Sequence, residues 1–188
     1  MHLSEQEIIR REKLAKLQEM GIDPYPAPLF PVNNTAANIL ANFKEGENNA
    51  DFKDVVLAGR IMNVRDMGKA NFAKLQDASG RIQLYIKRDE IAPGEDKSLY
   101  DEVWKHLTDI GDIIGVKGYV FTTKTGETSV HVKELCILTK SLKPLPVVKE
   151  KEGETFDAVT DPEFRYRQRY ADLIVNPQVK DTFLKRTK

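Results

Sequence analysis

The sequence predicts an all-β core with helical additions. Residues 71–77 and 81–87 alternate apolar and polar side chains, which is the period of a half-buried strand. Three further apolar-rich runs have strand character, and only residues 99–110 place apolar side chains at helical spacing between them. A parallel α/β sheet requires helices that alternate with its strands, so a single helix excludes that class.

The N-terminal segment has the pattern of a capped helix. Ser4 followed by Glu7 fits a capping box, and apolar residues then recur at near-helical spacing up to Gly21, a residue suited to a left-handed cap. We therefore predict a helix over residues 4–20. We expect its basic residues to lie on the solvent face: Arg10, Arg11, Lys13 and Lys16.

Four prolines at positions 24, 26, 28 and 31 follow, and they predict an extended strap because proline disfavours helix and removes backbone donors. Residues 34–53 carry no pattern that predicts an element. The expected order after them is a strand at 55–65, a hairpin at 71–77 and 81–87, a helix at 99–110, and strands at 113–122 and 128–138. Gly59 in the first strand predicts a bulge or a sharp coil.

This order matches a five-stranded Greek-key barrel of the oligonucleotide/oligosaccharide-binding (OB) type, in which the second and third strands carry the ligand face. We place three regions along the chain. Residues 1–51 form the helix and the strap, residues 52–146 form the barrel domain, and residues 147–188 form a linker and the start of a further domain. The last helical segment contains Phe183 and Leu184, and we expect the chain to be cut within it.

The alternation in the hairpin determines which side chains face outward. If Leu75 pairs with Ile82 in the core, then Phe72 lies opposite Tyr85 and Lys74 lies opposite Gln83 on the solvent side. A reader of single-stranded nucleic acid needs aromatic platforms for bases, amides for base edges and cations for phosphates. The predicted outward set supplies all three groups.

The charge distribution supports the same interpretation. The chain has 29 Lys plus Arg and 29 Asp plus Glu, whereas residues 59–88 contain seven basic and two acidic residues, a local net charge of +5. Two alternatives remain open at this point. Phe72 closes the barrel rim while Tyr85 packs under a loop, or the outward face binds an oligosaccharide.

Other function classes lack support in the sequence. The three His and the single Cys136 have no metal-binding spacing, and no phosphate-binding loop or nucleophile motif occurs, so we expect no metal and no catalytic site. The chain has neither a signal-peptide pattern nor an apolar run long enough for a membrane span. A single cysteine gives no reason to expect an oxidising compartment, and we expect a cytoplasmic protein without membrane contact.

Several segments together resemble the anticodon-binding domain of bacterial lysyl-tRNA synthetases (lysine–tRNA ligases). They are Gly59-Arg60-Ile61-Met62, Met67-Gly68-Lys69-Ala70-Asn71-Phe72, Gly80-Arg81-Ile82-Gln83-Leu84-Tyr85, Lys124-Thr125-Gly126-Glu127 and Leu138 to Pro146. The resemblance implies a barrel that binds the uridine-rich anticodon of tRNA(Lys). Residues 165–173 resemble the segment that leads into the catalytic domain of that family.

The same resemblance implies what the full-length parent does. This family joins lysine to tRNA through an ATP-dependent adenylate with Mg²⁺, in a class II catalytic domain that carries three signature motifs and forms a homodimer. Residues 183–186 resemble only the opening of the first motif. The second and third motifs are absent from these 188 residues, so we expect tRNA binding, no bound cofactor and no aminoacylation.

The resemblance also assigns roles to individual residues. It implies that Phe72 stacks on a base, that Gln83 and Glu127 hydrogen-bond base edges, and that Arg65 contacts a base or the backbone. A carboxylate is repelled by phosphate, which favours a base donor as the partner of Glu127.

We assign Lys69 and Lys74, two cations of the basic segment, to phosphate contacts. Arg60 is open to a structural role near the strand kink, and His131 to a place in the groove or on the ordinary surface. The rival hypotheses from other classes are a free-standing single-stranded nucleic-acid-binding module and a structural barrel that only joins partners.

Overall fold

The computed structural model describes residues 3–47, 49–146, 149–151, 154–156 and 162–187. They form two compact units, residues 1–143 and 144–188. The boundary expected from sequence adjoins residues 147–148, which lie outside the described residues. None of the helices in the described parts of the chain is long and apolar enough to cross a membrane.

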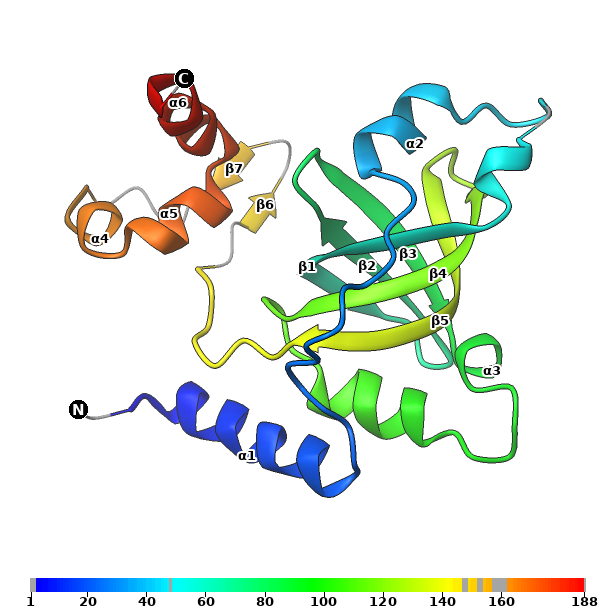
Figure 1. Cartoon of the computed structure of the whole chain (residues 1–188), viewed down its shortest axis with the longest axis horizontal. Coiled ribbons are helices and arrows are strands. Elements are labelled where there is room, and N and C mark those ends of the chain that lie inside the picture. Colours follow the sequence, from blue (N-terminus) through cyan, green and yellow to red (C-terminus); the bar gives the residue numbers. More distant parts are fainter. Residues whose placement is uncertain (1–2, 48, 147–148, 152–153, 157–161, 188) are drawn as a thin grey trace. The chain divides into compact units, whose positions relative to one another are not determined.

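Five strands of the first unit close into a barrel, as the sequence predicts (Figure 1). The order around the barrel is β1-β2-β3-β5-β4, with β3 and β5 parallel and the other neighbours antiparallel. The strands are β1 (Val55–Asp66), β2 (Ala70–Gln76), β3 (Arg81–Lys87), β4 (Ile113–Thr122) and β5 (Thr128–Thr139). This is the topology of an OB fold.

The hairpin β2–β3 has the predicted register. Leu75 pairs with Ile82 and both are buried, while Phe72 lies opposite Tyr85 and Lys74 opposite Gln83. Because successive side chains of a strand point to opposite faces, this register places the four polar and aromatic side chains outside the barrel.

Gly59 serves a different purpose from the one expected. Strand β1 stays paired with β4 at Gly59, and its irregularity lies further on, between Ile61 and Asn63. A Cβ atom at Gly59 would lie 2.6 Å from the carbonyl oxygen of Gln76, closer than such atoms approach. The glycine therefore permits the close approach of β1 and β2 where β1 changes partner.

The predicted N-terminal helix is α1 (Glu5–Glu19), with the Ser4 and Glu7 capping box and a positive φ of 76° at Gly21. The solvent face predicted for its basic residues is wrong at Arg10. That side chain is buried, and its two terminal nitrogens each donate to a backbone carbonyl, Ser141 O and Ile110 O, at 2.9 Å. Arg10 thus attaches the helix to the barrel.

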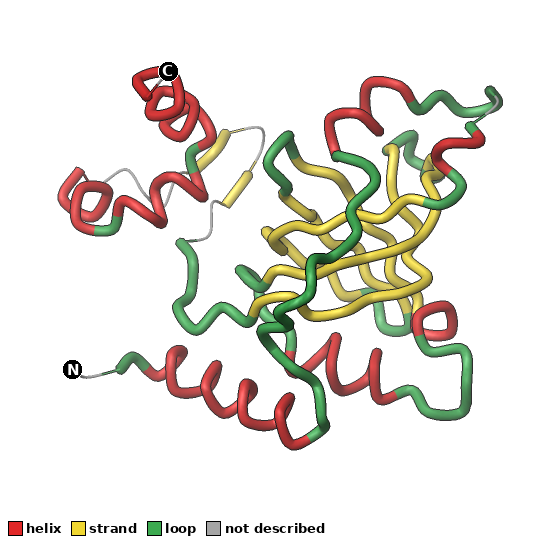
Figure 2. Tube along the Cα trace, viewed as in Figure 1, coloured by secondary structure: helices red, strands yellow, loops and turns green. Residues whose placement is uncertain are grey.

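The proline-containing segment runs across the outside of the barrel, where Figure 2 shows it as a loop over the strands. Its contacts include Lys140 N to Pro24 O at 3.2 Å and Asn33 N to Val56 O at 3.1 Å. The segment then enters α2 (Ala36–Asn42), a helix that the sequence did not predict, and η1 (Ala50–Phe52). Two of the seven residues of α2, Ala36 and Ile39, are buried.

The predicted second helix lies at one end of the barrel. It is the wider, π-type η2 (Leu99–Leu107), which ends before the expected residue 110. A short helix that the sequence did not predict, α3 (Arg88–Ile91), precedes it. Val103 and Leu107 pack with Leu17 of α1, whereas Tyr100 and Trp104 enter the barrel core. Figure 1 shows α1 beside this helix.

In its described residues the second unit contains a two-stranded sheet, β6 (Lys149–Lys151) and β7 (Glu154–Phe156), and three helices. They are α4 (Pro162–Arg167), α5 (Arg169–Val175) and α6 (Pro177–Thr187), and α6 contains the predicted Phe183 and Leu184. Asp172 of α5 is buried and accepts hydrogen bonds from Arg165 Nε at 3.0 Å and Asn176 Nδ2 at 2.8 Å.

Candidate nucleic-acid interface

The outward side chains of the barrel form a row of rings across four strands. Phe72 of β2 pairs with Tyr85 of β3, Tyr85 with His131 of β5, and His131 with Tyr119 of β4. The ring centroids of these successive pairs are 5.1, 5.0 and 4.8 Å apart. We call these four residues the aromatic row. The Phe72–Tyr85 and His131–Tyr119 rings are tilted by 41° and 35°, and the Tyr85–His131 pair is edge-to-face at 81°. The row therefore presents half-buried ring faces in more than one orientation, on which bases can stack.

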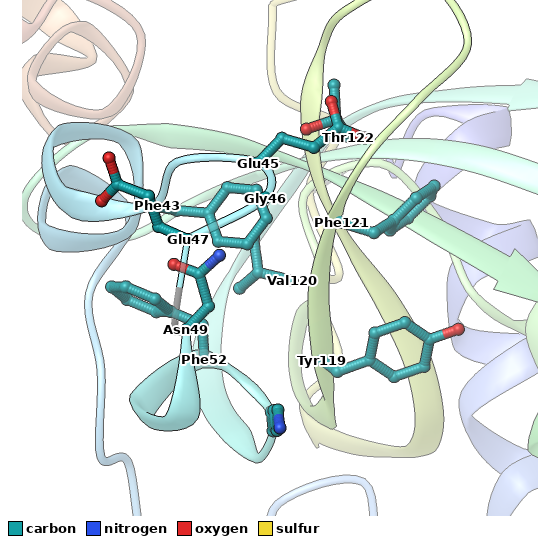
Figure 3. A pocket seen from close by; sticks show the side chains of 11 residues that line it. Phe43, Glu45, Gly46, Glu47, Asn49, Phe52, Tyr119, Val120, Phe121 and Thr122 are labelled. Atoms are coloured by element: carbon teal, nitrogen blue, oxygen red, sulfur yellow. The ribbon is translucent and has the colours of Figure 1, made fainter.

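A second row of outward positions lies beside the first. Lys74 of β2 pairs with Gln83 of β3, Gln83 with Ser129 of β5, and Ser129 with Phe121 of β4. Figure 3 shows Tyr119 and Phe121 on one side of β4, away from Phe43, and Val120 on the other. The two rows therefore place ring, amide and ammonium groups on one face.

A groove with a volume of about 740 Å³ lies over this face. Five of the six residues predicted from sequence line it: Arg65, Phe72, Lys74, Gln83 and Glu127. The sixth, Lys69, is exposed in the β1–β2 loop, where its carbonyl accepts from Arg88 N at 2.9 Å, and it does not line the groove.

Lys74 and Glu127 form an ion pair within the groove, with 2.7 Å between Nζ and Oε1. Both side chains are about half exposed. A pair this exposed to water contributes little free energy, roughly 0–1 kcal/mol, so each partner can exchange the other for a ligand group at small cost. Glu127 is held by the preceding turn, where its N–H donates to Thr123 Oγ1 at 3.0 Å.

Gln83 is held by a chain of two hydrogen bonds. Its Nε2 donates to Ser129 Oγ at 2.9 Å, and Ser129 Oγ donates to the main-chain carbonyl of Glu127 at 3.2 Å. Ser129 is fully buried beneath the groove. The two residues expected to contact base edges are therefore connected through a third.

His131 lies on the groove floor, which decides the question that the sequence left open. Its Nδ1 is 2.6 Å from the hydroxyl of Tyr119, and its buried Nε2 has no hydrogen-bond partner among the described residues. Burial lowers the pKa of His131, and burial raises the pKa of Tyr119, so both side chains are neutral near pH 7. The centre of the aromatic row is uncharged.

The two arginines of β1 have different surroundings. Arg65 is exposed and pairs with Phe72 on β2, which extends the aromatic row by one cation. Arg60 donates from Nη1 to Gly111 O at 2.6 Å, and burial lowers its pKa. Arg60 therefore has the structural role that the sequence allowed, and Arg65 is available to a ligand.

Sequence reasoning missed the part of the groove that β4 and β5 supply. Phe121 lines the groove, and Tyr119 and Ser129 contact the groove residues His131 and Gln83. None of the three was singled out, although Ser129 alternates with Val130, and Tyr119 and Phe121 flank Val120. The same period-two argument that was applied to the hairpin identifies these positions. Within the ranges that the structure describes, no group of three His, Cys, Asp or Glu side chains is arranged to hold a metal ion.

Residues 55–138, from the start of β1 almost to the end of β5, match the tRNA anticodon family model, described as an OB-fold nucleic acid binding domain. The whole chain aligns with lysine–tRNA ligases, including one from Porphyromonas gingivalis W83 at 61% identity over 187 residues. The chain corresponds to the N-terminal region of the lysine–tRNA ligases. The resemblance seen in the sequence is confirmed.

Two further lysine–tRNA ligases show the extent of this match. The one from Christiangramia forsetii is 57% identical over 187 residues, and the one from Azobacteroides pseudotrichonymphae is 55% identical over 186 residues. Each alignment covers 99% of this chain. The chain spans 32% of the Porphyromonas and Christiangramia relatives and 37% of the Azobacteroides relative. It corresponds to about a third of a lysine–tRNA ligase.

Proposed function

We propose that the groove binds the uridine-rich anticodon of tRNA(Lys). The observation that carries this proposal is the aromatic row, which continues Phe72 across β3, β5 and β4 beside amide, carboxylate and ammonium groups. Bases of a single-stranded loop are unstacked, so they can lie on exposed rings while side chains test their edges. The match to an anticodon-type OB-fold domain supports the same partner.

Within this groove four of the predicted residues have assigned roles toward the RNA. Phe72 stacks on a base, Gln83 and Glu127 hydrogen-bond to base edges, and Arg65 contacts a base or the backbone. The open volume over Phe72 and the position of Arg65 directly opposite it on β1 support these roles.

The two lysines are assigned to phosphates. Lys69 stands in an exposed loop outside the groove, and Lys74 exchanges Glu127 for a phosphate when RNA binds. Carboxylate Glu127 then turns to a base donor, because a phosphate would repel it. One ion pair thus separates into a backbone contact and a base contact.

We infer that the full-length parent is a homodimeric lysine–tRNA ligase of the cytoplasm that uses ATP and Mg²⁺. The names of its relatives, lysine–tRNA ligases, support the ligase activity in this inference. The resemblance of the sequence implies the homodimer and the use of ATP and Mg²⁺. The ligase reaction belongs to the catalytic domain, into which residues 147–188 lead. Residues 1–188 mixed with lysine, ATP and pyrophosphate are expected to show no exchange of pyrophosphate into ATP, and measurable exchange would contradict this assignment.

A titration of the 188-residue chain with anticodon stem-loops tests the proposed partner. We expect tighter binding to the tRNA(Lys) loop than to non-lysine loops, and weaker binding to all of them as salt rises from about 50 to about 200 mM. Equal affinity for the lysine loop and for poly-deoxythymidine would favour a general single-strand binder. No affinity for any RNA would favour a structural barrel.

A further inference from the structure

Ser129 joins the two predicted base readers from below the groove. Its side chain is fully buried, and strands β3 and β5 pair in parallel so that Ser129 stands beside Gln83. No sequence-based assignment includes Ser129, and its hydroxyl links Gln83, 46 positions away along the chain, to Glu127, two positions away.

The hydroxyl of Ser129 has one hydrogen, and it is donated to the carbonyl oxygen of Glu127 at 3.2 Å. Toward Gln83 the same oxygen can therefore only accept, which it does from Nε2 at 2.9 Å. Rotating the amide by 180° would place its oxygen against Ser129. The hydroxyl would then have to abandon Glu127 or face a second acceptor, so the observed orientation has two hydrogen bonds and the rotated one has one.

This orientation determines what Gln83 presents to a ligand. With its nitrogen held by Ser129, the amide offers Oε1, an acceptor, to the groove that Gln83 lines. Uracil has a donor at N3–H between two acceptors, whereas cytosine has a bare acceptor at N3 and a donor at its exocyclic amine. An acceptor fixed opposite N3 pairs with uracil and meets a lone pair on cytosine. A freely rotating amide would accommodate both bases.

We propose that Ser129 is a positioning residue that fixes the Gln83 amide with its oxygen toward the base, and that this makes the groove select uridine over cytidine. The proposal rests on the proposed binding of RNA in the groove. In this proposal the preference of Gln83 for uridine over cytidine depends on Ser129, which does not contact the RNA.

The turn before β5 does not depend on Ser129 alone. The carbonyl of Glu127 also accepts from Thr123 N at 3.0 Å, and Glu127 N donates to Thr123 Oγ1. Ser129→Ala therefore removes one oxygen atom while the turn that carries Glu127 keeps its other hydrogen bonds. The amide of Gln83 then loses the partner that orders it.

The test compares the tRNA(Lys) anticodon stem-loop with loops in which each uridine in turn is replaced by cytidine. For the wild-type chain we expect at least about tenfold weaker binding when the uridine read by Gln83 is replaced. Ser129→Ala is expected to reduce this ratio to within about threefold while the affinity for the uridine loop changes by less than about threefold. The control is Ser141→Ala, because the hydroxyl of Ser141 donates to Lys143 O outside the groove. This variant is expected to keep the wild-type ratio.

A double-mutant cycle with Gln83→Met separates positioning from a general structural effect. If Ser129 acts through the amide, Ser129→Ala has no further effect on the uridine-to-cytidine ratio in the Gln83→Met background. A further loss of the ratio in that background overturns the proposal. The proposal is also overturned if Gln83→Met keeps the wild-type ratio of uridine to cytidine affinity. This result does not depend on whether the Ser129 variant folds.

The outcomes distinguish this proposal from the proposed function. If the wild-type chain does not bind the lysine loop, the proposed function fails and the selectivity mechanism fails with it. If the wild-type chain binds and discriminates but Ser129→Ala discriminates equally well, only the role of Ser129 is overturned.

Discussion

Lys74 and Glu127 are 2.7 Å apart in the groove, although Lys74 is assigned to a phosphate and Glu127 to a base donor. The pair joins β2 to the turn before β5 across 53 positions of sequence. In the free protein each charge neutralises the other, and the proposed RNA contacts require the two charges to separate. The ion pair therefore keeps Lys74 and Glu127 close together in the free protein, and both side chains remain about half exposed to solvent.

The stability of the barrel is expected to depend little on this pair. Lys74→Ala and Glu127→Ala should each change the free energy of unfolding by less than about 1 kcal/mol, because both side chains are about half exposed. Urea denaturation of the two variants measures this change. A loss of several kcal/mol would mean that the pair is part of the fold.

The same two variants are expected to differ in their effect on RNA. Lys74→Ala should weaken binding to every loop by a similar factor and reduce the salt dependence by about one phosphate contact. Glu127→Ala should instead reduce the preference for uridine over cytidine. Titrations of each variant with lysine and non-lysine loops at several salt concentrations measure both effects. Equal losses on all loops for Glu127→Ala would remove its base-reading role.

Phe72→Ala is expected to weaken binding of the lysine anticodon loop by about tenfold or more, because stacking on one ring contributes roughly 1–3 kcal/mol. The matched control is Tyr166→Ala, which removes a 75% exposed ring from α4, outside the groove. A binding titration on both variants, with circular dichroism to verify folding, decides the matter. An unchanged affinity in folded Phe72→Ala would mean that this ring is not a platform.

Much of the site on the hairpin could be predicted because side chains alternate between the two faces along a strand. Placing one side chain in the core therefore determines the face of every other side chain in that strand. Once Leu75 and Ile82 are in the core, Phe72 and Gln83 have no alternative to the outer face. The rest of the site could not be predicted from local patterns, because its contacts depend on the order of the strands in the barrel. Gln83 meets Ser129 through the parallel pairing of β3 with β5, a contact between residues 46 positions apart, and no local pattern specifies that pairing.

The helices show the same limit. The ends of α1 follow from Ser4, Glu7 and Gly21, which are local signals. Its buried face does not, because the packing of Arg10 depends on two distant carbonyls that only the folded chain brings to it. Helix α2 escaped prediction because seven residues with two buried side chains are too few to show a helical period.

His131 is expected to make stability dependent on pH on the acid side of neutrality. Burial lowers its pKa in the folded state, while an unfolded histidine titrates near about 6.5. Between these values the unfolded chain binds more protons, so the free energy of unfolding falls as the pH falls below about 6.5. Urea denaturation at several pH values should show a smaller fall for His131→Asn than for wild type. His106→Asn, which changes an exposed histidine, should follow the wild-type curve, and parallel curves for all three chains would contradict the assignment.

Lys140 offers a comparison between a buried and an exposed ion pair at the same distance. Its Nζ is 2.7 Å from Asp112 Oδ2, and both side chains are fully buried, whereas Lys117 and Glu134 are also 2.7 Å apart but lie at the surface. Lys140→Met removes one charge and leaves Asp112 buried without its cation, so we expect a loss of about 3–5 kcal/mol in the free energy of unfolding. Lys117→Met removes an equivalent charge where water replaces it, and we expect almost no change. Thermal and urea denaturation of both variants measure the difference. Similar losses in the two variants would mean that distance alone, and not burial, sets the contribution of these pairs.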